Sequence, residues 1–211
     1  MRLACSLWNV AGPRAESEAR RLAAAGVQLF HWDRSDGSMA KAGGFTAGQA
    51  RGIGRQVAAR AEAHLMLARP LAEVETWCEF CELVVVHAEA ADAAAACARI
   101  RELGRQPGIA LSPGSEPRPG LLEDLVQAGA ELDTAVLVMA VKPGCAGSQF
   151  EPSTAARLTS LAPRALLGVD GAMTLERLAA VRQAGANWAV SGTDLLASPN
   201  PAAWLTQASA L

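Results

Sequence analysis

The alternation of short apolar runs with longer amphipathic segments is the feature that most constrains how this chain folds. Apolar, often β-branched runs of strand length recur about eight times between alanine-, leucine- and arginine-rich segments with helical spacing. We expect strands near residues 3–8, 27–32, 64–67, 83–87, 109–112, 135–141, 165–169 and 187–191. We expect helices near residues 14–25, 46–61, 72–80, 90–103, 121–128, 152–161, 175–184 and 201–209.

A strict alternation of strands and helices implies parallel strands joined by right-handed crossovers. Two α/β architectures meet this condition, an open doubly wound sheet and a closed (β/α)8 barrel. Eight repeats favour the closed TIM barrel, and 211 residues lie near the lower size limit of that fold. We therefore expect one domain over residues 1–211, with short loops and no room for a second domain.

Composition excludes several classes of protein. A chain with 51% hydrophobic residues builds a sufficient core without metal or disulfide staples, so a bound metal would be functional. With 19 basic against 21 acidic residues, the chain lacks the basic excess of nucleic-acid binders. Its longest strongly apolar run, residues 135–141, is too short to span a membrane. Five cysteines, an odd number, favour reduced thiols and a cytoplasmic location. We interpret Cys78 and Cys81 as residues that pack in the core rather than as a redox or zinc motif.

Polar residues at the ends of apolar runs are candidates for a metal site. They are His31 and Asp33 on the second run, His64 on the third and Asp170 after the seventh. Barrel active sites form where the strands end, and residues two apart on a strand share a face. Two imidazoles and two carboxylates suit zinc, manganese, iron or cobalt. Taken alone, each histidine is more simply explained as a core residue and each aspartate as a helix cap. The metal-site hypothesis therefore depends on the placement of all four residues at strand ends. We interpret the third histidine, His87, as structural.

Small residues follow the last three apolar runs and are candidates for binding phosphate. Pro143 to Gly147 follow the sixth run, Gly171 and Ala172 the seventh, and Gly192 and Thr193 the eighth. Backbone N–H groups in such loops reach anions, and loops at this place in a (β/α)8 barrel commonly bind phosphate. The alternative is that these small residues only form ordinary turns and bind no phosphate.

The motifs of these segments are similar to those of the ribulose-phosphate 3-epimerase family over nearly the whole chain. The family's H-x-D-x-x-D-G begins at His31, its H-x-M begins at His64, and its M-x-V-x-P-G-x-x-G begins at Met139. Its V-D-G ends at Gly171, its S-G-[ST] ends at Thr193, and its early serine matches Ser6.

The resemblance implies a metal-dependent epimerase that interconverts D-ribulose 5-phosphate and D-xylulose 5-phosphate through a cis-enediolate. It implies that Asp33 and Asp170 exchange the proton on opposite faces of the reacting carbon, and that one divalent ion (zinc, manganese, iron or cobalt) binds each subunit of a homo-oligomer. The implied metal ligands are His31, Asp33, His64 and Asp170. The implied substrate-binding residues are Ser6, His64, Met66, Met139, Gly144, Cys145, Ala146, Gly147, Gly171, Ala172, Gly192 and Thr193.

The chain departs from the family pattern at several positions near the expected substrate. Ser35 replaces the usual methionine, which predicts a smaller and more polar wall, and the loop after Gly37 lacks the usual proline and amide. Ala172 replaces a glycine, and a small residue at this place also occurs in relatives that act on allulose 6-phosphate. Two alternatives therefore stay open: a 3-epimerase of another ketose phosphate, such as D-allulose 6-phosphate, and a non-catalytic sugar-phosphate-binding relative. We interpret the tryptophans at 8, 32, 77, 188 and 204 as core or interface packing.

Overall fold

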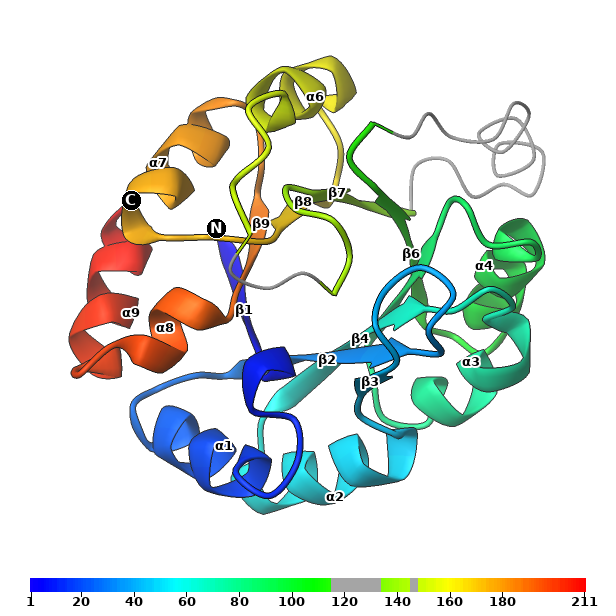
Figure 1. Ribbon diagram of the computed structural model, residues 1–211, viewed down its shortest axis with the longest axis horizontal. Helices are drawn as coiled ribbons and strands as arrows, with labels where there is room; N and C mark the ends of the chain where they lie inside the picture. Colours follow the sequence, from blue (N-terminus) through cyan, green and yellow to red (C-terminus); the bar gives the residue numbers. More distant parts are fainter. Residues whose placement is uncertain (115–133, 145–147) are drawn as a thin grey trace.

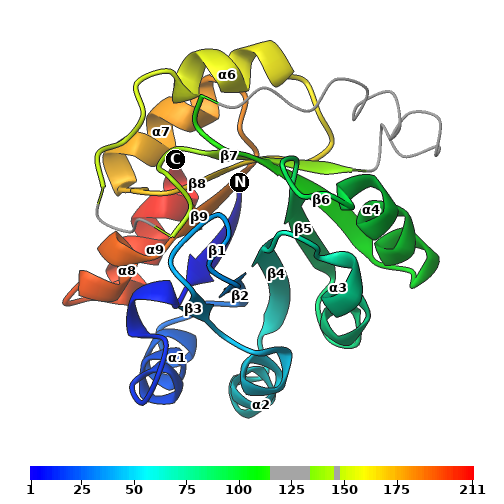
Figure 2. The same ribbon diagram turned by 45° about the vertical axis from the view of Figure 1, so that its right-hand side comes forward.

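The chain folds into a closed barrel of parallel strands surrounded by helices (Figures 1 and 2). This computed structural model describes residues 1–114, 134–144 and 148–211. In those ranges the parallel strands are β1 (Arg2–Ser6), β2 (Leu29–Ser35), β4 (Arg60–Met66), β5 (Leu83–His87), β6 (Gln106–Leu111), β7 (Ala135–Met139), β8 (Leu167–Asp170) and β9 (Trp188–Ser191). The β1 strand pairs with β9 on one side and with β2 on the other, which closes the ring. The short β3 (Gly43–Gly44) lies antiparallel to β2.

The α-helices of the described residues lie on the outside of the barrel (Figure 1). They are α1 (Ala15–Ala24), α2 (Ala47–Val57), α3 (Leu71–Cys78), α4 (Ala93–Glu102), α6 (Thr154–Leu161), α7 (Leu175–Gln183), α8 (Thr193–Ala197) and α9 (Pro201–Ala210). The short 3-10 helix η1 (Trp8–Val10) follows β1. The expected (β/α)8 architecture is confirmed. The helix expected at 121–128 lies outside the described residues. No helix within the described ranges is long and apolar enough to span a membrane.

Strand residues alternate between two separate apolar cores. Leu29, Leu137 and Trp188 belong to a buried cluster in the barrel interior. Trp32 and Val86 belong to a larger cluster that the helices cover from outside. Both faces of the parallel strands are therefore buried, which explains why β5 and β7 have continuous apolar sequences without the alternation of a half-exposed strand.

The expected boundary between the second helix and the third strand was wrong. The helix predicted over 46–61 ends at Val57, where Ala58 adopts a left-handed φ of 50°. The strand predicted over 64–67 begins four residues earlier, at Arg60, whose N–H donates to Gln28 O at 2.9 Å. Pairing with β2 thus overrides the local helical preference of the alanines.

The first expected strand, 3–8, is also too long at its carboxyl end. It ends at Ser6, and Trp8 begins a short 3-10 helix. The backbone N–H of Trp8 donates to Ser6 Oγ at 3.1 Å, which turns the chain away from the sheet. This turn places residues 8 and 9 at the rim of the barrel, next to the site described below.

Candidate active site

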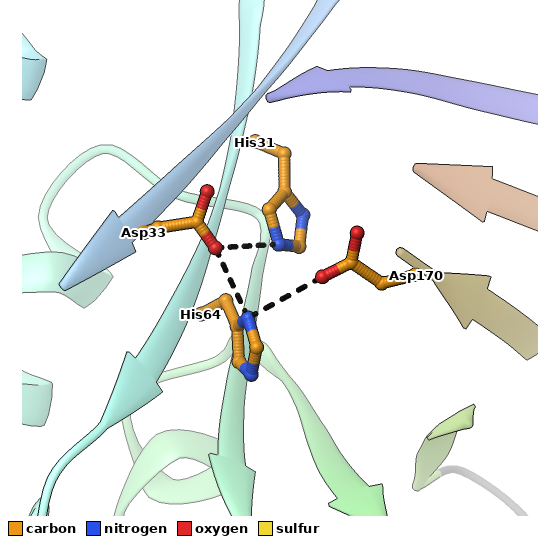
Figure 3. Close-up of side chains that lie close together, drawn as sticks. All are labelled: His31, Asp33, His64 and Asp170. Atoms are coloured by element: carbon orange, nitrogen blue, oxygen red, sulfur yellow. Dashed lines mark hydrogen bonds and ion pairs between the residues drawn. The ribbon is translucent and has the colours of Figure 1, made fainter. Parts of the chain in front are cut away.

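Four of the sequence-predicted residues converge inside the carboxyl end of the barrel (Figure 3). His31 and Asp33 extend from β2, His64 from β4 and Asp170 from the end of β8. One ligand atom from each lies within 4.8 Å of the others. His64 Nδ1 lies between the two carboxyl groups, 3.1 Å from Asp33 Oδ1 and 3.8 Å from Asp170 Oδ2. His31 Nε2 lies 3.5 Å from Asp33 Oδ1.

The environment separates the pKa values of the two carboxyl groups. Burial alone would raise the pKa of Asp33, but the imidazoles of His31 and His64 hold it well below its usual range. Burial raises the pKa of Asp170 to about 6 against the influence of His31, and the neighbouring Asp33 carboxylate adds to the rise. Two carboxyl groups that differ in this way are typical of a site that both removes and returns a proton.

The donor set fits a divalent cation. His31 Nε2 is buried and has no hydrogen-bond partner within the part of the chain that the structure describes. It faces two carboxylates and a second imidazole, which together are the ligands expected for zinc or a similar first-row ion. Burial would lower the pKa of His31, but Asp33 and Glu62 hold it well above its usual value. A buried nitrogen with no hydrogen bond to the described residues, so close to two carboxyl groups, favours cation binding.

Groups behind the cluster fix the orientation of its members. Ser6 Oγ donates to Asp33 Oδ2 at 2.6 Å. His64 Nε2 lies 2.9 Å from His87 Nε2, so His87 supports the site, in line with the structural role expected for it. His31 Nδ1 lies 2.7 Å from Glu62 Oε1. Glu62 was not predicted as part of the site, although it lies two residues before His64 on the same strand face.

A pocket with about 520 Å³ of empty space, part of it open solvent, lies above the cluster. Asp33 and Asp170 line it together with other residues, among them Ser6, His64, Met66, Met139, Gly144, Gly171, Ala172, Val190, Gly192 and Thr193. All the predicted substrate-binding residues that the structure describes are thus at the pocket, whereas Cys145, Ala146 and Gly147 lie outside the described residues.

Ala172 has a backbone conformation that L residues rarely adopt. Its φ is +54°, in the left-handed region. Arg177 Nη1, from the first turn of α7, donates to Ala172 O at 2.5 Å, and the Arg177 guanidinium lies 5.0 Å from the centre of the Phe150 ring. Arg177 therefore fixes one edge of the pocket where phosphate binding is expected.

Trp8 and Asn9 are pocket residues that the sequence analysis did not assign to the site. Trp8, which we expected to pack in the core or at an interface, has a partly exposed ring that forms a pocket wall against β3 and the loop after β7. A Cβ at Gly44 would lie 3.0 Å from Trp8 Cζ3, and one at Gly144 would lie 3.4 Å from Trp8 Cζ2. Asn9 Nδ2 donates to Thr193 Oγ1 at 2.7 Å.

The expectation that Ser35 makes a pocket wall polar was also wrong. Ser35 is fully buried and is not among the residues that line the pocket. Its hydroxyl donates to Ala40 O at 3.1 Å and accepts from Gly37 N at 3.2 Å. Ser35 therefore supports the loop after β2 and does not offer its hydroxyl to a ligand in the pocket.

The fold and the site define the class of this chain as a TIM barrel with an acid–base cluster at the carboxyl ends of its strands. Comparison with known proteins gives the family. Residues 2–196 match the ribulose-phosphate 3-epimerase family. The chain belongs to this family, and it is accordingly an enzyme, a carbohydrate-phosphate epimerase. The non-catalytic alternative is not supported.

Curated relatives agree with this assignment, and a solved structure shares the fold. Ribulose-phosphate 3-epimerase of Chlamydia trachomatis is 29% identical over 187 residues, which cover 83% of this chain and 78% of the relative. That of Chlamydia muridarum is 29% identical over 186 residues, covering 83% and 79%. The 3-hexulose-6-phosphate synthase of Salmonella typhimurium has a similar fold, with a TM-score of 0.75 at 15% identity over 100% of this chain and 97% of that one.

Proposed function

We propose that this enzyme interconverts D-ribulose 5-phosphate and D-xylulose 5-phosphate by proton transfer at carbon 3. The observation that carries the proposal is the position of Asp33 and Asp170, which line one pocket and each have a carboxyl oxygen within 3.8 Å of His64 Nδ1. Family membership supports the substrate, since the relatives of similar length carry the name ribulose-phosphate 3-epimerase.

His31, Asp33, His64 and Asp170 would hold one divalent cation, with zinc, manganese, iron or cobalt as candidates. When bound there, the cation supplies positive charge that stabilises the enediolate formed after proton removal. Asp33 and Asp170 would thus serve both as ligands and as acid–base groups.

Asp33 and Asp170 would act as the two proton carriers. One carboxylate removes the proton from carbon 3, and the other carboxyl group returns a proton to the opposite face, with the roles reversed in the reverse reaction. The hydroxyl of Ser6 holds Asp33 through Oδ2 and leaves Oδ1 directed at the cluster. Asp33 therefore has a fixed orientation before substrate binds.

The remaining pocket residues would bind and shield the substrate. Met66 and Met139 are almost fully buried and form apolar walls, which limit water at the reacting carbon. We assign phosphate binding to the backbone at the ends of the last strands, at Gly144, Cys145, Ala146, Gly147, Gly171, Ala172, Gly192 and Thr193. Phosphate contact by backbone N–H groups follows the usual arrangement of this fold.

The test is proton NMR of ribulose 5-phosphate in D₂O with zinc-loaded protein. We expect deuterium to enter carbon 3 and xylulose 5-phosphate to form. Asp33→Asn and Asp170→Asn should each reduce turnover on the order of 10²- to 10⁴-fold, the usual contribution of a positioned acid or base. Circular dichroism of both variants checks that they fold.

Each other outcome has a definite meaning. Folded, zinc-loaded protein that leaves carbon 3 unexchanged would refute the proposed reaction. Exchange with allulose 6-phosphate but not with ribulose 5-phosphate would keep the chemistry and replace the substrate. Full activity in Asp170→Asn would refute the two-carboxylate mechanism alone.

A further inference from the structure

Glu62 is a charged residue in the interior of the barrel. It lies on β4, two residues before His64, and its side chain has no exposed surface. It does not line the pocket, so a role in contacting substrate is excluded. A carboxylate in such a place is costly unless it is paired and hydrogen-bonded, and its presence needs a reason.

Both oxygens of Glu62 bind fixed donors from other strands. Oε1 accepts from His31 Nδ1 at 2.7 Å and from Trp188 Nε1 at 3.1 Å. Oε2 accepts from Arg2 Nη2 at 2.7 Å and from Arg2 Nε at 3.2 Å. Arg2 therefore balances the charge, Trp188 restrains the same oxygen that meets His31, and the carboxylate cannot turn without breaking these bonds.

This arrangement decides which nitrogen of His31 faces the cluster. Because Nδ1 is directed at Glu62, Nε2 is the atom directed at Asp33, and Nε2 has no hydrogen-bond partner among the described residues. A histidine ligand held from behind by a carboxylate is both oriented and made a stronger electron donor.

We propose that Glu62 is the positioning residue that makes His31 a cation ligand, with Arg2 and Trp188 holding Glu62 in turn. The inference rests on the cation-binding part of the proposed function. His64 differs, because a neutral ring, that of His87, lies behind it where His31 has a carboxylate. His31 is thus the ligand whose affinity for a cation depends most on a charge outside the pocket.

The first test is zinc affinity at fixed pH, measured by competition with a chromophoric chelator. Glu62→Gln should bind zinc about 10- to 100-fold more weakly, the usual effect of removing such a partner. Glu82→Gln is the matched control, because Glu82 also pairs with Arg2 at 2.7 Å but its side chain is 32% exposed. Within the described structure no contact joins Glu82 to His31. This control should bind zinc like the wild type.

The second readout is ¹⁵N NMR of the His31 ring in the zinc-loaded protein. We expect a protonated Nδ1 whose proton exchanges slowly in the wild type and in Glu82→Gln, and whose resonance shifts in Glu62→Gln. A residue that only filled the barrel interior would not move this signal. Unchanged zinc affinity and an unchanged His31 resonance in Glu62→Gln would overturn the inference.

Should Glu62→Gln fail to fold, Glu62→Asp decides the question. Aspartate keeps the charge that Arg2 requires but shortens the reach to His31, so weaker zinc binding supports the inference and unchanged binding overturns it.

Zinc binding without epimerisation would refute the proposed reaction and leave this test intact. Epimerisation with wild-type zinc affinity in the Glu62 variants would refute this inference alone, and a wild type that binds no zinc would refute it too.

Discussion

Replacing Arg2 should destabilise the barrel far more than replacing a neighbouring arginine on its surface. Arg2 is the cation that balances Glu62, whose side chain is 0% exposed, and the Arg2 side chain itself is only 20% exposed. The change Arg2→Met keeps the length of the side chain and removes the charge. Glu62 then remains buried with two donors, His31 Nδ1 and Trp188 Nε1.

The magnitude follows from that burial. Removing one partner of a buried ion pair costs about 3–5 kcal/mol, and we reduce this to about 2–4 kcal/mol because the two other donors remain. For a chain of this size each kcal/mol corresponds to about 2–4 °C, so the melting temperature should fall by about 4–16 °C. The control is Arg60→Met. Arg60 is 59% exposed and pairs with Glu82 at the surface, so its loss should cost at most about 1 kcal/mol.

The assay is urea denaturation followed by tryptophan fluorescence, with a chelator present so that bound cation does not contribute to stability. The free energies of unfolding of the two variants are compared with that of the wild type. Equal losses for Arg2→Met and Arg60→Met, each below about 1 kcal/mol, would refute the claim that Glu62 depends on Arg2 for its charge balance.

Three further changes test other parts of the structure. Gly168→Ala should destabilise the protein by about 1–3 kcal/mol, because the new Cβ overlaps the Trp188 ring, whereas Gly52→Ala, with open space around it in α2, should stabilise by about 0.5–1 kcal/mol in the same denaturation assay. Trp8→Ala should raise the ratio of kcat/KM for six-carbon over five-carbon ketose phosphates by roughly tenfold, since a pocket wall is removed; an unchanged ratio would exclude Trp8 from substrate selection. Arg177→Met should raise KM with little change in kcat, since its guanidinium holds the edge of the pocket where we place phosphate.

The sequence predicted the architecture because each repeat carries its own local signals. The strand expected at 83–87 is β5 without change, since its apolar residues are buried on both faces. The start of α7 at Leu175 was predicted as well, and the preceding Thr174 accepts from Arg177 N as an N-cap. The boundary near Ala58 could not be predicted in this way, because pairing between distant strands determines it.

The predicted ligands were found from a different kind of signal, the polar residues at strand ends. Their spacing predicts that His31 and Asp33 lie on the same face of a strand. Their closeness to Asp170 could not be predicted, because it depends on the closure of the barrel. Trp8 was missed for the same reason, because the chain leaves the sheet after Ser6 and no periodicity governs where the ring then points. The alternation of side chains along a strand could have predicted Glu62, because it lies two residues before His64. It was not predicted because the expected strand began at residue 64 and the observed strand begins at Arg60.

The contacts of Glu62 also link cation affinity to folding. Its donors lie on β1, β2 and β9, the three neighbouring strands at which the ring closes, so His31 acquires its orientation only in the closed barrel. A cation that binds this closed state stabilises it by RT ln(1 + [L]/Kd). At a fixed, saturating zinc concentration, the expected 10- to 100-fold loss of affinity in Glu62→Gln therefore removes about 1.4–2.7 kcal/mol of the stabilisation by zinc. Because Glu82→Gln disturbs Arg2 without touching His31, it should lower the stability of the metal-free protein and leave the increment from zinc unchanged.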